Sequence, residues 1–128
     1  MIVVDSSVWI RALRSRSCPE AITLRSLLEA DEVALAVPVR TELLMGARAS
    51  DRARLAGALK PVPLLYPTDD TWKTIDRWTA RAADAGFTFA IGDLLIAALA
   101  TEVGGLIWSL DRDFCQMEQL NLVRRFGV

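Results

Sequence analysis

The sequence contains no histidine, and its two cysteines, Cys18 and Cys115, do not form a Cys-x-x-Cys pair. Because cysteine and histidine supply the ligands of usual zinc sites, such a site is excluded. The absence of histidine also excludes mechanisms that need a histidine base, including the Ser-His-Asp and Cys-His arrangements. Any acid–base or metal chemistry in this chain therefore depends on carboxylates.

Long hydrophobic runs are also absent, since every apolar stretch is interrupted well before about 18 residues, so no membrane span is expected. No basic segment precedes the apolar N-terminus, and Asp5 interrupts it, so we expect no signal peptide, a cytoplasmic location and reduced cysteines. We find no internal repeat, low-complexity tract or linker. With 128 residues, of which 52% are hydrophobic, the chain is expected to form a single domain over residues 1–128.

The chain has no overall excess of positive charge, because its formal net charge is −1 and its sequence pI is about 5.4. A protein that binds nucleic acid through its overall charge is therefore not indicated. Arginines nevertheless form two local groups that are either solvated helix faces or binding sites for phosphates. These groups are Arg11, Arg14 and Arg16, followed by Arg48, Arg52 and Arg54.

Strand-like and helix-like segments alternate along the chain, which predicts an α/β domain with a parallel sheet. The first ten residues, MIVVDSSVWI, begin with an apolar run without alternation, which is typical of a strand buried on both faces. Further strands are expected at residues 32–37, 60–67 and 106–109, with a last short strand near Leu122 and Val123. Helices are expected over residues 7–15 (Val8, Trp9 and Leu13 inward), 19–30, 38–47, 50–59, 68–85 (Trp72, Ile75, Thr79 and Ala82 inward) and 93–103.

Acidic residues stand at corresponding places in four of these segments. Asp5 and Asp111 follow predicted strands, Glu42 lies in the helix after another strand, and Asp93 begins a helix that is apolar nearly all round. In a parallel sheet the carboxyl ends of all strands lie on one edge, so these acids are expected to converge there. Neighbouring carboxylates repel one another unless a cation offsets their charge, and an all-oxygen ligand set selects Mg²⁺ or Mn²⁺. Such a site is suited to phosphodiester hydrolysis.

Each acid also has a purely structural interpretation. Asp5 and Asp93 are at positions where they could cap helices, Glu42 could interact with a helix dipole, and Asp111 or Asp113 could stabilise a turn. A shared site is favoured because four separate segments each bring an acid to the same edge. Serine or threonine could cap a helix equally well, yet neither is found at any of these four positions.

At these residues the sequence resembles a PIN domain, and specifically the VapC toxin family of toxin–antitoxin ribonucleases. The apolar strand followed by Asp-Ser-Ser resembles the family's Asp-(Thr/Ser)-Ser motif, and residues 41–47, TELLMGA, resemble its Glu-Leu motif. Residues 91–98, IGDLLIAA, resemble its Asp-containing helix start. Residues 107–114, IWSLDRDF, resemble its late Thr-x-Asp-x-Asp-Phe segment, with Ser109 in place of the more usual threonine.

The resemblance implies a three-layer α/β/α fold with a central, mainly parallel sheet, and a Mg²⁺-dependent endoribonuclease in which Mn²⁺ is a possible substitute. It implies that Asp5, Glu42, Asp93 and Asp111 form the acidic cluster, with Asp5 and Asp93 as the likeliest direct metal ligands. Asp111 is preferred to Asp113 as the fourth acid because it is closer to the strand end. Ser6, Ser109 and Asp113 are candidates for supporting roles, and Arg11, Arg14 and Arg48 for contacts to RNA phosphates. The family further implies a homodimer and a cognate VapB-type antitoxin.

Three alternatives remain open at this point. A non-catalytic PIN-like interaction domain would keep the fold without the chemistry, and a metal-dependent DNA nuclease could use the same acids. A phospho-receiver domain is less favoured, because a single Asp5 follows the first strand and the only lysines, Lys60 and Lys73, do not follow a late strand.

Overall fold

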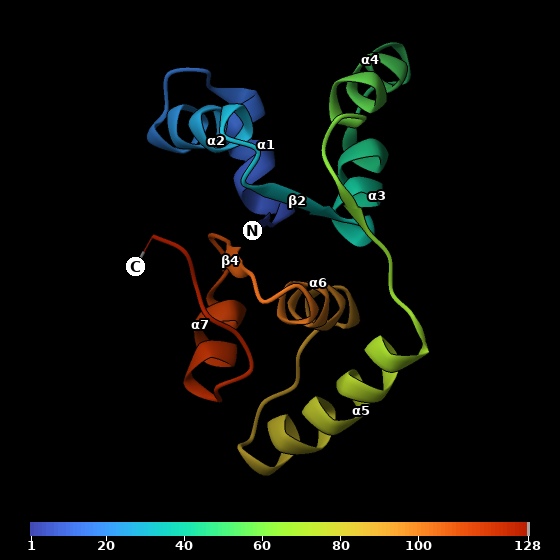
Figure 1. Cartoon of the computed structure of the whole chain (residues 1–128), viewed down its shortest axis with the longest axis vertical. Helices are drawn as coiled ribbons and strands as arrows, with labels where there is room; N and C mark the ends of the chain where they lie inside the picture. The colour runs from blue at the N-terminus through green and yellow to red at the C-terminus, as the bar shows by residue number, and fades with distance from the viewer. Residues whose placement is uncertain (128) are drawn as a thin grey trace.

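The computed structural model describes residues 1–127 and contains a four-stranded sheet in which all paired strands are parallel (Figure 1). The strand order is β3-β2-β1-β4, so that the first strand is central. The strands are β1 (Ile2–Val4), β2 (Val33–Ala36), β3 (Leu64–Leu65) and β4 (Leu106–Trp108). The prolines that flank β3 predict an edge or short strand, and β3 is both.

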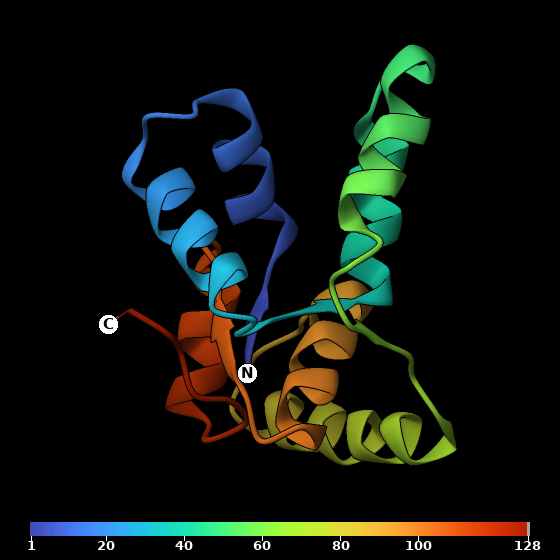
Figure 2. The same ribbon diagram turned by 45° about the horizontal axis from the view of Figure 1, so that its top comes forward.

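Seven helices flank the sheet within the described residues, and they confirm the predicted α/β/α class. They are α1 (Ser6–Arg14), α2 (Pro19–Glu29), α3 (Val37–Gly46), α4 (Ala49–Leu59), α5 (Asp69–Asp84), α6 (Ile91–Glu102) and α7 (Arg112–Gln119). Helix α6 packs against β1 and β2, and α5 packs against α6. Figure 2 shows the pairs α1–α2 and α3–α4 standing on the same side of the molecule, beyond the end of β1. No helix is long and apolar enough to cross a membrane within residues 1–127.

The core explains why these segments form these elements. Every residue of β1 and β2 is buried, as the non-alternating apolar runs predict. Helix α6 is buried at six positions between Leu94 and Ala100, and it packs these apolar side chains into the core against the sheet. Phe114 and Met117 of α7 have no exposed surface, and they fix the segment that follows β4 against the core.

The expected strand near Leu122 and Val123 is wrong. Both side chains are buried, but the chain turns at Asn121, which has a positive φ of 61°. It then pairs with β4 only through an isolated bridge between Ile107 and Arg125. The strand prediction identified the buried residues correctly and misplaced the backbone pairing by two to three residues.

The inward face of α5 also differs from the prediction. The buried positions are Thr71, Ile75, Trp78 and Ala82, while Trp72 is 42% exposed. The hydroxyl of Thr71 donates a hydrogen bond to Glu102 Oε1 on α6 at 2.6 Å, which turns this side of the helix inward. Leu13 of α1, expected inside, is 57% exposed.

Candidate metal centre at the carboxyl edge of the sheet

The strand register places Asp5 beside the end of β4. Val4 pairs with Trp108, and the backbone N–H of Asp5 donates to the carbonyl oxygen of Trp108 at 2.9 Å. The next residue on each strand is therefore Asp5 on one side and Ser109 on the other. This is how a parallel sheet brings residues 104 positions apart in the chain to one edge.

Asp5 is a buried carboxylate, with 5% of its surface exposed. It occupies the N-cap position of α1, but its side chain makes no capping hydrogen bond. Instead its Oδ2 accepts hydrogen bonds from the hydroxyls of Ser7 and Ser109, each at 2.7 Å. The capping interpretation of Asp5 is therefore wrong, because its oxygens are directed to the edge of the sheet.

Glu42 lies in the second turn of α3, and the first turn of this helix contains no acidic residue. The helix-dipole interpretation of Glu42 is therefore wrong. Its Oε2 accepts a hydrogen bond from Ser6 Oγ at 3.1 Å. Burial raises the pKa of the Glu42 carboxyl, the hydrogen bond from Ser6 opposes this change, and the charge of Asp5 adds to it.

Asp93 is the third residue of α6, whose N-cap is Ala90, so Asp93 does not cap this helix. Burial, as the largest cause, and the negative charges of four other acids together raise the pKa of the Asp93 carboxyl from 3.8 to about 7. In decreasing order these are Asp111, Asp5, Asp113 and Glu42. The acids thus converge in the structure as predicted, and the charges of the other four all act on the carboxylate of Asp93.

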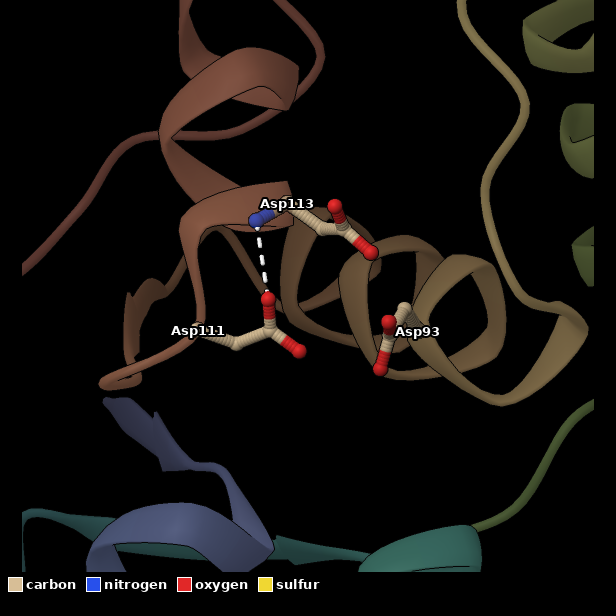
Figure 3. A group of neighbouring side chains, drawn as sticks. All are labelled: Asp93, Asp111 and Asp113. Carbon is tan, nitrogen blue, oxygen red and sulfur yellow. Dashed lines mark hydrogen bonds between the residues drawn. The ribbon is translucent and has the colours of Figure 1, made fainter.

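Asp111 and Asp113 both reach this region. Asp111 is the N-cap of α7, and its Oδ1 accepts a hydrogen bond from the backbone N–H of Asp113 at 3.0 Å. Asp93, Asp111 and Asp113 each offer one carboxylate oxygen, and these oxygens lie within 4.8 Å of one another. Figure 3 shows the three side chains, from the starts of α6 and α7, around a common space. Asp111 therefore caps a helix and borders the site, and Asp113 stands beside it.

The donor set fits a hard divalent cation. Five carboxylates gather at this edge, and none of them forms an ion pair with an arginine or lysine within residues 1–127. Oxygen ligands without histidine or thiolate suit Mg²⁺ or Mn²⁺. The carboxylate oxygens of Asp93, Asp111 and Asp113 lie within 4.8 Å of one another. Asp5 and Glu42 also act on Asp93, and the charge of Asp5 raises the pKa of Asp93 more than the charge of Asp113 does.

A groove of about 610 Å³ lies between α1, α3 and α4, and Glu42 lines it. Its apolar lining includes Ile10 and Leu13, which explains why the Leu13 side chain faces outward. Arg14 and Arg48 also line the groove, and neither is in an ion pair in the described part of the chain. Arg11, the third candidate for phosphate contacts, is paired with Glu20 at 3.4 Å.

Sequence reasoning missed one residue of this edge, Ser7. Its hydroxyl donates to Asp5 and accepts from the backbone N–H of Leu110 at 3.1 Å. A serine two positions after an aspartate is a recognised source of local side-chain hydrogen bonds, so the spacing carried a usable signal. Of the supporting candidates, Ser6 contacts Glu42 and Ser109 contacts Asp5.

The sequence model of the PIN domain matches residues 2–120 of this chain. The chain belongs to the PIN-domain family.

Within this family its relatives are VapC proteins. It is 34% identical over 119 residues to Ribonuclease VapC11 of Mycobacterium tuberculosis (strain H37Rv), with 89% of each chain covered. It has the same identity and coverage with VapC ribonuclease Mb1587 of Mycobacterium bovis. The resemblance to VapC proteins that the motifs indicate is thereby confirmed.

Solved structures show the same fold. VapBC2 from Rickettsia felis, bound to a DNA fragment from its promoter, gives a TM-score of 0.81 at 14% identity and covers 98% of both chains. VapC20 of Mycobacterium tuberculosis, a sarcin–ricin loop cleaving toxin, gives a TM-score of 0.63 at 22% identity and covers 91% of this chain and 94% of its own.

Proposed function

We propose that this chain is a Mg²⁺-dependent endoribonuclease and the toxin of a VapBC-type toxin–antitoxin system. Membership in the PIN-domain family and the identity to proteins named VapC ribonucleases support ribonuclease activity. The observation that carries the cation dependence is the half-buried carboxylate of Asp93, which faces four other acids and has no basic partner among residues 1–127. A divalent cation is the partner that such a cluster requires.

Asp5 and Asp93 would hold the cation directly, and Asp111, Glu42 and Asp113 would complete the site or orient a water molecule. When bound, Mg²⁺ lowers the pKa of a coordinated water and stabilises negative charge on phosphoryl oxygens. The raised pKa of the Asp93 carboxyl means that it gives up its proton near neutral pH, where cation binding competes with protonation. Mn²⁺ would fit the same oxygen ligands.

The groove beside Glu42 gives an RNA strand access to the acids. Arg14 and Arg48 line it and are available for phosphate contacts, while the ion pair with Glu20 makes Arg11 less available. These contacts would supply local positive charge to a chain whose net charge is −1. We assign phosphate binding to Arg14 and Arg48 before Arg11.

The proposed partners are a VapB-type antitoxin and a second copy of this chain. The Rickettsia felis structure and VapBC-1 from nontypeable Haemophilus influenzae are both VapBC assemblies of this fold, the latter with a TM-score of 0.78. An antitoxin would silence the nuclease by occupying the region around the acids, so adding it in stoichiometric amount is expected to stop cleavage.

The test is cleavage of a mixed RNA population by the purified protein with Mg²⁺, with a chelator, and with the chelator followed by excess Mg²⁺. We expect cleavage only with free cation, and we expect Asp5→Asn and Asp93→Asn to lower it at least 100-fold. Asp76→Asn, which removes an exposed acid of α5, is the matched control and should cleave normally. Cleavage that persists in chelator would refute the metal mechanism.

The same assay distinguishes the alternatives. DNA of matched sequence should remain intact, and preferential cleavage of DNA would reassign the substrate. If Mg²⁺ neither promotes cleavage of any nucleic acid nor raises the melting temperature, the non-catalytic interpretation would hold.

A further inference from the structure

Two serine hydroxyls hold one oxygen of Asp5. Ser7 Oγ, from the first turn of α1, and Ser109 Oγ, from the end of β4, lie 2.7 Å from the same atom, Asp5 Oδ2. Both distances are those of charge-assisted hydrogen bonds to a carboxylate. The contacts join two elements that are adjacent in space and about a hundred residues apart in the chain.

The direction of these hydrogen bonds follows from the groups around each hydroxyl. The N–H of Leu110 donates to Ser7 Oγ at 3.1 Å, and the N–H of Asp111 donates to Ser109 Oγ at 3.0 Å. Each hydroxyl carries a single proton, and the carboxylate of Asp5, which can only accept, is its closest acceptor at 2.7 Å. Both protons are therefore directed to Asp5 Oδ2. No proton remains for a hydrogen bond between the two hydroxyl oxygens, which lie 3.3 Å apart.

The second oxygen of Asp5 is in a different situation. No side-chain or backbone group within residues 1–127 donates a hydrogen bond to Oδ1, and this atom is not among the buried polar atoms that lack a partner. Oδ1 is therefore not fully buried, and the charge of the Asp5 carboxylate raises the pKa of both Glu42 and Asp93. One oxygen of Asp5 is occupied and the other is free to bind a cation.

We propose that Ser7 and Ser109 are positioning residues that restrict Asp5 to binding a cation through Oδ1 alone, and that they thereby favour Mg²⁺ over Ca²⁺. This inference rests on the proposed metal-dependent function. Mg²⁺ requires near-ideal octahedral geometry at about 2.0–2.1 Å, whereas Ca²⁺ accepts about six to eight oxygens and readily binds carboxylates through both of them. A carboxylate whose second oxygen is held by two hydroxyls keeps the one-oxygen contact that Mg²⁺ uses and loses the two-oxygen contact that is open to Ca²⁺.

Removing the hydroxyls would free Oδ2 and allow Asp5 to turn toward a cation with both oxygens. The affinity for Mg²⁺ should fall, because groups that orient metal ligands contribute about 10- to 100-fold to affinity. The affinity for Ca²⁺ should fall less or rise. The ratio of the two affinities is therefore the informative quantity, since a purely structural role of the serines would weaken binding of both cations together.

The experiment is calorimetric titration of the purified protein with Mg²⁺ and, separately, with Ca²⁺. The variants are Ser7→Ala, Ser109→Ala, the double variant and Ser109→Thr, which keeps a hydroxyl. Ser26→Ala, at an exposed position of α2, is the matched control. We expect the Mg²⁺-to-Ca²⁺ affinity ratio to fall by about tenfold or more in the double variant. It should fall by a smaller factor in each single alanine variant and be retained in Ser109→Thr and in the control.

The outcomes separate this inference from the proposed function. If the wild-type protein binds Mg²⁺ and cleaves RNA but the alanine variants keep its affinity ratio, only the positioning role is refuted. If the wild-type protein binds neither cation, both are refuted. Circular dichroism checks that each variant is folded, and if the double variant is not, the two single alanine variants decide the result.

Discussion

Replacing Asp93 by asparagine should make the cation-free protein more stable while it abolishes the activity. The carboxylate of Asp93 is half-buried, has no basic partner in the described part of the chain, and faces Asp111, Asp5, Asp113 and Glu42. Asparagine has nearly the same shape and no charge. The substitution therefore removes repulsion without creating a cavity.

The magnitude follows from the pKa of Asp93, which is raised from 3.8 to about 7. At about 1.4 kcal/mol for each tenfold change in proton affinity, this corresponds to at most about 4 kcal/mol of unfavourable free energy in the ionised folded state. Because the side chain is half-buried and solvent screens part of the repulsion, we expect about 1–2 kcal/mol. For a domain of this size, that corresponds to a rise in melting temperature of roughly 4–8 °C.

The pH dependence has a defined sign. Between about pH 4 and pH 7 the folded protein holds the Asp93 proton more tightly than the unfolded chain does, so the stability of the wild-type protein falls as the pH rises through this range. Below about pH 4 the Asp93 carboxyl is protonated in both the folded and the unfolded protein, so it does not lower the free energy of unfolding. The advantage of Asp93→Asn should therefore be absent at pH 4, develop up to pH 7, and stay constant above it.

The assay is thermal unfolding of both proteins at pH 4, 6 and 8 with chelator, repeated at pH 8 with Mg²⁺. Mg²⁺ should raise the melting temperature of the wild-type protein and have little effect on Asp93→Asn, because a ligand stabilises only the form that binds it. Asp76→Asn should behave as wild type. If Asp93→Asn is equal to or less stable than the wild-type protein at pH 8, the charge argument is wrong.

Three further substitutions test other parts of the structure. Asp5→Asn should abolish cleavage and leave the free energy of unfolding unchanged or lower it by up to about 2 kcal/mol, because hydrogen bonds stabilise this carboxylate. Gly105→Ala should cost about 1–3 kcal/mol in urea unfolding, since its Cβ would lie 2.7 Å from the Met1 carbonyl oxygen, whereas Gly57→Ala meets nothing within 4 Å. Thr71→Val should cost about 1–3 kcal/mol because the buried Thr71 hydroxyl accepts a hydrogen bond from the backbone N–H of Thr68 and donates one to Glu102, with cleavage by the folded protein unchanged.

The sequence predicts the site better than it predicts the surfaces around it, and parallel topology is the reason. Once β1, β2 and β4 are recognised as parallel strands, their carboxyl ends must share an edge, and Asp5, Glu42 and Asp111 follow without knowledge of any side-chain contact. Asp93 needed the additional inference that α6 starts at the same edge. The field that all four other acids exert on Asp93 confirms that this helix does so.

Helix faces were less predictable, as α5 demonstrates. The expected stripe through Trp72 and Thr79 and the observed stripe through Thr71 and Trp78 both include Ile75 and Ala82, and they differ by one residue. Periodicity alone does not separate two stripes rotated by so little. In the structure Thr71 lies inward, where its hydroxyl donates to Glu102 of α6 and also accepts from the backbone N–H of Thr68 in the capping box of α5. The contact with α6 depends on tertiary packing, which periodicity does not encode.

Asp5 and Asp93 carry the same charge, but the protein accommodates them by different means. Asp5 is the more buried, and its Oδ2 accepts hydrogen bonds from the hydroxyls of Ser7 and Ser109. Asp93 has no such donors within residues 1–127, and burial, together with the negative charges of the neighbouring acids, raises its pKa to about 7. In the proposed metal site, Asp93 is therefore the acid that would gain most from a bound cation, while Asp5 would supply a ligand atom from a carboxylate that is already held in place. The different environments of Asp5 and Asp93 explain how the chain folds with five acids at one edge of the sheet while the carboxylate of Asp93 still lacks a compensating positive charge within residues 1–127.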